Sequence, residues 1–186
     1  VRDVCRVLDA ADRPVYYYHC PPNNGINLSL AQFEAILSHP NLKGIKNSAS
    51  NMWLRRELIL LKQEKGLKPV LLEGQEWAAD EALLVGYDGM LCGMGALGSR
   101  FMVGIARAVD GGDVAEAVRL QNRFIGLFHG VYGADLSTVW VGQKYALKCL
   151  GLCASERTLA QRMEALTETR KREIEAYVEA FRKELE

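Results

Sequence analysis

The sequence predicts an α/β fold: a (β/α)8 TIM barrel of which residues 1–111 supply about the last four βα units, followed by a C-terminal helical region over 112–186. Strand-like runs alternate with helical patterns between residues 14 and 109, as expected for a parallel sheet with helices against it. The chain also opens with a helical pattern that follows no strand. An eightfold barrel typically takes about 250 residues. These observations favour half of a barrel, with two unpaired strand edges, over a small open sheet.

The barrel region is predicted from local patterns taken in order. An amphipathic helix is expected over 1–11. Aromatic, β-branched or apolar runs bounded by Pro, Gly or Asn predict strands at 14–20, 41–46, 69–74 and 89–93. Helices are expected at 28–37, 52–65, 77–87 and 101–109, with 22–27 as a loop. Ser29 is the expected N-cap of the first of these four helices, and Gly66 ends the second.

The region after Gly112 shows helical patterns and no further strand pattern. Helices are expected over 114–128, 139–150 and 167–186. The last of these places one apolar face among many charges, made of Ile174, Tyr177, Val178 and Phe181. Because its charges are balanced, this helix is expected to pack against the protein rather than on a membrane.

Composition excludes several classes of function. The 186 residues carry 23 basic and 23 acidic side chains, so the formal charge is zero and offers no electrostatic footprint for nucleic acid or an anionic membrane. There is no long apolar run and no signal-peptide pattern, so we expect a soluble cytoplasmic protein. The chain begins with Val1 in the middle of a helical pattern, which suggests a fragment of something longer.

The cysteines and histidines give no sign of a metal site. Five cysteines include no C-x-x-C, and three histidines are scattered along the chain. Cys149 and Cys153 stand at i and i+4, which would place them on one helix face. Free thiols are the expected state.

Two residues at strand ends carry the candidate chemistry. Side chains alternate along a strand, so Gly44 and Lys46 share one face, as Tyr16 and Tyr18 do on the preceding strand. Catalytic groups of a barrel sit at the carboxyl ends of its strands, where Tyr18 and Lys46 both fall. Gly44 leaves room for a neighbouring phenol. The spacing therefore allows Tyr18 and Lys46 to meet over one pocket.

An amine beside a phenol suits Schiff-base chemistry on a carbonyl substrate. The amine must be neutral to attack, and a free lysine, with a pKa of about 10.4, is neutral only about once in 2,500 molecules at pH 7. An apolar site without a carboxylate favours the neutral amine. No acidic residue lies within five positions of Lys46 in the sequence. A lysine at a strand end is usually solvated and strand tyrosines usually pack, so spacing alone leaves both interpretations open.

The stretch from Gly93 to Gly98 matches G-x-G-x-x-G, the dinucleotide fingerprint. The fingerprint normally opens a first βαβ unit, and its acidic residue ends a second strand. Here no strand pattern follows, and Asp113 lies in a G-G-D turn between helices. Nucleotide binding is therefore the weaker hypothesis, and glycines that let the backbone approach a pocket are the alternative.

Several motifs in the right order resemble one family. Y-Y-Y-H-C-P (16–21), G-I-K-N-S (44–48), L-L-E-G (71–74) and G-Y-D-G-M-L-C-G (86–93) resemble the N-acetylneuraminate lyase and dihydrodipicolinate synthase family. The likeness runs through essentially the whole chain, including Q-K-Y-A-L-K-C-L-G (143–151) in the helical tail.

The resemblance implies a fold and a reaction. It implies a (β/α)8 barrel of which this chain covers the fifth to eighth strands, with a Schiff-base lysine at Lys46 and a catalytic tyrosine at Tyr18. It implies reversible aldol chemistry on pyruvate or a related 2-keto acid, an aldehyde as the second reactant, no metal or organic cofactor, and a homotetramer. The family's first half, with its small-hydroxyl motif for the keto-acid carboxylate, is expected to be absent here. A non-catalytic paralogue that binds a keto acid, or an inactive barrel fragment, is the alternative.

The residues around the expected pocket differ from both branches of the family. Dihydrodipicolinate synthases usually carry an arginine just after the tyrosine motif, where this chain has the stretch 22–25, Pro-Asn-Asn-Gly. In sialic-acid lyases an acidic pair follows the glycine of the seventh strand, which is Gly74 in this chain. Glu76 and Trp77 stand here in place of that pair. Gly93 stands in place of the serine that those lyases carry after the eighth strand. Gly74, Glu76, Trp77 and Gly93 are the expected substrate-binding residues. Trp77 offers a flat apolar wall, which suggests a shorter or aromatic aldehyde.

Overall fold

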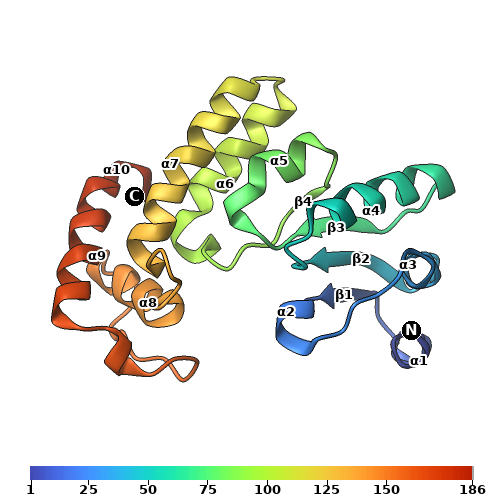
Figure 1. The fold of residues 1–186 in the computed structure, drawn as a ribbon, viewed down its shortest axis with the longest axis horizontal. Coiled ribbons are helices and arrows are strands. Elements are labelled where there is room, and N and C mark those ends of the chain that lie inside the picture. Colours follow the sequence, from blue (N-terminus) through green and yellow to red (C-terminus); the bar gives the residue numbers. More distant parts are fainter. Residues whose placement is uncertain (186) are drawn as a thin grey trace. The chain divides into compact units, whose positions relative to one another are not determined.

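A parallel sheet organises the first part of the molecule. The computed structural model describes residues 1–185, which form two compact units, Val1–Gly93 and the part that begins at Met94. In the first unit, strands β1 (Val15–His19), β2 (Leu42–Asn47), β3 (Val70–Glu73) and β4 (Gly89–Met90) pair in the order of the sequence, all parallel (Figure 1). This is the α/β arrangement that the sequence predicts.

The helices of the first unit begin and end at residues with a clear local reason. They are α1 (Arg2–Ala10), α2 (Pro21–Asn24), α3 (Leu30–Leu37), α4 (Met52–Lys65), the 3-10 turn η1 (Glu76–Ala78) and α5 (Ala79–Leu84). Ser29 caps α3 in a capping box with Gln32, as a hydroxyl can when an amide side chain stands at N3. Asn51 caps α4, and Gly66 ends it at a φ of 61°.

The two faces of the sheet differ. One face carries Ile45 and Leu71, both fully buried, and packs against apolar side chains from α1, α3, α4 and α5. The other face carries Tyr16, which is 57% exposed, and Tyr18, which is 48% exposed. Among the described residues of this unit, the helices that pack on the sheet therefore cover one face only. Parallel sheets are normally covered on both.

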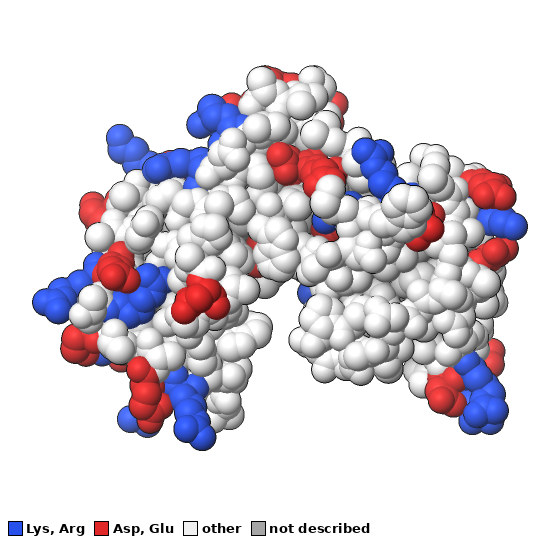
Figure 2. Space-filling model, viewed as in Figure 1, with Lys and Arg blue, Asp and Glu red and all other residues white. Residues whose placement is uncertain are grey.

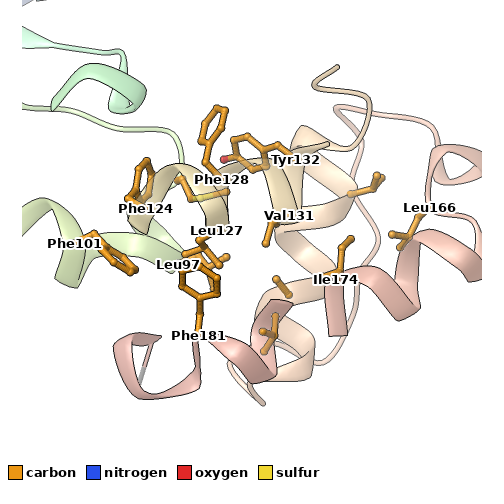
Figure 3. Close-up of a cluster of buried hydrophobic side chains, with 14 residues drawn as sticks. Leu97, Phe101, Phe124, Leu127, Phe128, Val131, Tyr132, Leu166, Ile174 and Phe181 are labelled. Atoms are coloured by element: carbon orange, nitrogen blue, oxygen red, sulfur yellow. The ribbon is translucent and has the colours of Figure 1, made fainter. Parts of the chain in front are cut away.

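The second unit is helical. It consists of α6 (Gly95–Asp110), α7 (Val114–Tyr132), α8 (Val139–Cys149), the 3-10 turn η2 (Met163–Ala165), α9 (Glu168–Ala180) and α10 (Arg182–Leu185). Its core is rich in aromatic rings, with Phe101, Phe124 and Phe128 packed in a row from α6 and α7, and Phe181 closing on Phe101 (Figure 3). Ile174 and Val178 of α9 are buried here, which confirms the predicted packing. The single helix expected over 167–186 divides at Phe181 into α9 and α10 within the described residues. Glu186, the last residue of that prediction, lies outside them.

The structure corrects the predicted elements in four further places. Residues 22–24, expected within a loop, belong to α2, because two prolines preset the φ angle of its first turn. The helix expected over 77–87 divides into η1 and α5. The strand expected over 89–93 is limited to Gly89–Met90, and the helix expected at 101 begins at Gly95.

Cys149 and Cys153 do not share a helix face. Helix α8 ends at Cys149, and Gly151 turns the chain away at a φ of 72°. Cys153 instead donates its thiol to the carbonyl oxygen of Lys144. Both thiols are free.

The compact units divide at 93/94, so α6 packs with the helices that follow it. The assignment of residues 1–111 to a barrel half and of 112–186 to a helical region remains a prediction. Charges of both signs lie side by side on the face seen in Figure 2. Ion pairs of the described residues include Arg119 with Glu116 and Lys171 with Glu168. None of the helices in residues 1–185 is long and apolar enough to cross a bilayer.

Candidate active site

The register of the sheet brings Tyr18 and Lys46 together. Their Cα atoms are direct partners in the β1–β2 ladder, and side chains at paired positions of parallel strands point to the same face. The Nζ atom of Lys46 lies 4.4 Å from the centre of the Tyr18 ring. A Cβ atom on Gly44 would lie 2.8 Å from a ring carbon of Tyr16, so the glycine does leave room for a phenol. The predicted meeting of Tyr18 and Lys46 is confirmed as geometry.

Gly74 closes against the stem of Lys46. A Cβ atom added to Gly74 would overlap the Ser48 hydroxyl and lie 2.7 Å from Cε of Lys46. The Gly74 amide donates to the carbonyl oxygen of Asn47 at 2.8 Å, which ties the loop after β3 to the end of β2. The absence of a side chain at position 74 is therefore what lets the lysine stem and the Ser48 hydroxyl occupy this space.

Ser48 is a residue of the site that the sequence did not single out. Its Oγ atom is enclosed, and its hydroxyl lowers the pKa of the neighbouring Tyr18 phenol, against the effect of burial. Strand alternation could have found it, because Gly44, Lys46 and Ser48 stand two positions apart and share a face.

Glu76 brings a carboxylate to the site. It is 4% exposed, and its Oε2 atom accepts a hydrogen bond from the Gly93 amide at 3.3 Å, so these two predicted residues meet. The charge of Glu76 also acts on Tyr18, whose ring lies 4.4 Å from the Nζ atom of Lys46. Although no acidic residue is close to Lys46 in the sequence, the fold therefore brings one to the site. Trp77 follows Glu76 in η1 and is 43% exposed.

This arrangement raises the pKa values of two side chains, Tyr18 and Cys92. Burial raises the pKa of Tyr18, and the Cys20 thiol and the charge of Glu76 raise it further. Burial also raises the pKa of Cys92 to about 12, together with the charge of Glu76 and against the positive charge of Lys46. Cys92 thus lies within electrostatic range of both Lys46 and Glu76, although no sequence pattern indicated it. The phenol and the thiol both remain neutral near pH 7.

The glycine-rich stretch is accounted for by helix packing. Helix α6 begins at Gly95 and is followed by α7, so the second strand of a dinucleotide-binding unit does not follow. Gly98 is buried, and a Cβ atom there would lie 2.8 Å from the ring of Phe124 in α7. Of the three glycines, Gly98 is the one that serves the close approach of α6 and α7. Within the described residues, no three His, Cys, Asp or Glu side chains are grouped as metal ligands.

Comparison with known proteins links this chain to one family. The family model described as the Dihydrodipicolinate synthetase family matches residues 4–181. An uncharacterized DapA-like lyase from Pyrobaculum neutrophilum is 32% identical over 133 residues, covering 70% of this chain and 43% of the lyase. The chain thus spans about half the length of the curated relatives it matches.

Solved structures show the same fold at lower identity. Dihydrodipicolinate synthase from Bacteroides thetaiotaomicron superposes with a TM-score of 0.84 at 22% identity, covering 96% of this chain and 60% of that one. N-acetylneuraminate lyase from Fusobacterium nucleatum, in complex with pyruvate, gives a TM-score of 0.83 at 17% identity, covering 97% and 60%. At this level of identity the likeness concerns the fold.

Proposed function

The chain belongs to the dihydrodipicolinate synthetase family, and from this we propose that it is a lyase or aldolase that forms a Schiff base between Lys46 and pyruvate or a related 2-keto acid. The observation that carries the proposal is the Lys46 amine 4.4 Å from the Tyr18 ring, at the carboxyl ends of neighbouring parallel strands. An amine held beside a phenol combines a nucleophile with a proton donor and acceptor.

The proposed reaction runs through an imine. The neutral amine of Lys46 attacks the keto carbon, and the resulting carbinolamine loses water to give a protonated imine. Tyr18 supplies the proton that leaves with the hydroxyl group. When the bound substrate is a 4-hydroxy-2-keto acid, the deprotonated Tyr18 takes the proton of the 4-hydroxyl group while the electron pair of the C3–C4 bond moves to the imine. An aldehyde leaves, and Tyr18 returns the proton to the enamine carbon. Water hydrolyses the pyruvate imine and restores Lys46. The reverse sequence is condensation, and no step calls on a metal or an organic cofactor.

We propose that the sheet is half of an eightfold barrel. The family likeness, the consecutive parallel strand order and the one-sided helix cover support this. About four more βα units would cover the face that carries Tyr16 and Tyr18 and would supply the groups that bind the keto-acid carboxylate. A homotetramer of such barrels is part of the same proposal.

The pocket residues favour a short or aromatic aldehyde partner. Glu76 already bonds the Gly93 amide, and Trp77 leaves 43% of its surface exposed as an apolar wall. Neither offers the set of polar partners that a sugar chain requires. Equal turnover of N-acetylneuraminate and simple aromatic keto acids by the intact enzyme would contradict this choice.

Borohydride trapping with pyruvate tests the reaction. The chain, and a version extended by the first four βα units of a related lyase, are reduced in the presence of pyruvate, and the modified peptide is identified by mass spectrometry. We expect an adduct on Lys46 in the extended version, and none in Lys46→Met. Tyr18→Phe should keep the adduct but lose about 10²–10⁴-fold in turnover. Saturable pyruvate binding without any adduct would instead favour a keto-acid-binding protein.

A further inference from the structure

A buried ion pair lies at the carboxyl end of the sheet, on its covered face. Arg55 of α4 is 3% exposed and Glu73, the last residue of β3, is 1% exposed. The Nε atom of Arg55 donates to Oε2 of Glu73 at 2.8 Å, and Nη1 lies 3.3 Å from a Glu81 carboxylate oxygen. In many proteins a buried ion pair stabilises the fold no more than apolar side chains of the same volume would. The pair is therefore better explained by the groups that it holds in place than by a gain in stability.

Glu73 uses its second oxygen to hold the loop that follows β3. Its Oε1 atom accepts hydrogen bonds from the Gly74 amide at 2.9 Å and the Gln75 amide at 3.2 Å. Burial raises the pKa of Glu73, and Arg55 opposes this by favouring the charged carboxylate. An ionised carboxylate is the stronger acceptor for both amides.

This loop touches the lysine directly. Gly74 is the residue whose missing Cβ leaves room for Cε of Lys46, and its amide also bonds the carbonyl oxygen next to that lysine. Gln75 donates from its side chain to the Ser50 hydroxyl. Ser50 lies in the loop after Lys46 and has a positive φ of 53°, which a non-glycine residue adopts at a cost. The loops after β2 and β3 are thereby fixed to each other.

We propose that Arg55 is a positioning residue for Lys46, acting through the Glu73 carboxylate to fix the Gly74–Gln75 backbone against the lysine stem. The proposal rests on the proposed function in one respect, that Lys46 is the nucleophile. Arg55 and Glu73 stand 18 positions apart in the sequence, which explains why no short sequence pattern indicates this role.

Amide hydrogen exchange tests the mechanical part without any reaction. In Arg55→Met we expect the Gly74 and Gln75 amides to exchange about tenfold faster, while the amides of Ile45 and Leu71 keep their protection. Arg55→Lys retains one charged donor, so its exchange rates at Gly74 and Gln75 should lie between those of wild type and Arg55→Met. It replaces Arg55→Met in the test if that variant does not fold. The matched control is Arg123→Met, which removes an arginine–glutamate pair with Glu184 in the helical unit. Unchanged exchange at 74–75 with an intact core would overturn the proposal.

Borohydride trapping in the version that gives the wild-type Lys46 adduct tests the link to the nucleophile. Misplacing a reacting group by about 1 Å costs up to about 100-fold, so we expect the adduct-forming rate constant at saturating pyruvate to fall about 10- to 100-fold in Arg55→Met. If Arg55→Met only reduced the amount of folded protein, the labelled fraction would fall and the rate constant of the folded molecules would stay unchanged. Because Arg55 acts through Glu73, Arg55→Met combined with Glu73→Gln should be no slower than the worse single variant.

The two measurements separate failures. If wild type gives no adduct at Lys46, the proposed function fails, and the exchange data still decide whether Arg55 fixes the loop. If exchange rises in Arg55→Met but the rate constant does not fall, Arg55 holds the loop and does not position Lys46, and the proposal is wrong. Additive effects of Arg55→Met and Glu73→Gln would equally contradict it.

Discussion

Gly74 is the residue at which the smallest change has the largest expected effect on the site. The lysine stem and a hydroxyl group fill the space that a methyl group would need there. A core that is already filled responds to an added carbon by moving side chains or backbone. At Gly74 the neighbours that would have to move are Lys46 and Ser48, so a packing change becomes a change in the chemistry.

We therefore expect Gly74→Ala to impair the proposed nucleophile. The variant should lose about 1–3 kcal/mol in the free energy of unfolding and form the Lys46–pyruvate adduct at least about tenfold more slowly. Urea unfolding and borohydride trapping measure the two effects. Gly95→Ala is the control, because nothing lies within 4 Å of its added Cβ atom in the first turn of α6. Equal adduct rates in both variants would show that position 74 has room to spare.

Tyr87 predicts a pH dependence of stability. It is 4% exposed and its hydroxyl accepts a hydrogen bond from Nδ2 of Asn47 at 3.1 Å. Burial raises the pKa of Tyr87 above the ordinary value of a phenol, so the fold favours the neutral form. Its contribution is fully present below a pH of about 10, the pKa in the unfolded chain, and is lost as the pH rises beyond it.

Tyr87→Phe should accordingly flatten the alkaline loss of stability. Each proton bound more tightly by the folded state contributes a slope of about 1.4 kcal/mol per pH unit above the unfolded pKa. Urea unfolding between about pH 8 and pH 11 compares the two slopes. We expect the variant to be less stable than wild type at pH 8 and to lose less stability by pH 11. Parallel curves would mean that water reaches the Tyr87 hydroxyl.

At the scale of elements, the repeating strands and helices follow from the sequence because each is decided locally. Ser29 caps α3 together with Gln32, three residues further on. Gly66 ends α4 because it adopts a positive φ angle. Where the prediction was wrong, local signals were ambiguous. Prolines suit a loop and a first helical turn alike, and the glycines at 95 and 98 concealed the start of α6 because glycine has a low helix propensity.

The candidate site divides in the same way. The pairing of Tyr18 with Lys46 was predictable, because alternation along two strands and a parallel register are enough to place both side chains. Arg55 and Glu73 stand 18 positions apart, and Glu76 meets Gly93 across 17. Such contacts depend on how helices and loops pack against the sheet. No short sequence pattern predicts that packing. Ser48 lay within reach of the alternation rule.

The contact between α7 and α9 gives a prediction for the helical unit. A Cβ atom on Gly130 would overlap the ring of Tyr177, so the two helices approach through a glycine. Gly130→Ala should cost about 1–3 kcal/mol in the free energy of unfolding, although alanine is the better helix former. Adding Tyr177→Ala should recover part of the loss. Gly104→Ala is the control, since its Cβ would meet only a terminal methyl group of Leu120 at 3.0 Å. Thermal unfolding of Gly130→Ala, of its combination with Tyr177→Ala and of Gly104→Ala measures these differences in stability.

At the scale of the molecule, the proposed barrel makes its own prediction. Within residues 1–185, β1 pairs with β2 alone, so one side of its backbone is open to another strand. If about four further βα units close the barrel, amides of Val15–His19 that are free of β2 should exchange at least about tenfold more slowly in the extended version. Amides within α4 are the internal reference for general stabilisation. Equal slowing in β1 and α4 would argue that the added units do not pair with β1.

The strand order β1-β2-β3-β4 has a consequence for how the protein is made. Each of the strands β2, β3 and β4 pairs with the strand before it in the chain, so that partner has already left the ribosome when the new strand emerges. Each new strand can then be added to a finished edge during translation, and the loop to be closed is only the segment between two consecutive strands. The strand ends that carry Tyr18 and Lys46 would take shape on the nascent chain before the last helices are synthesised.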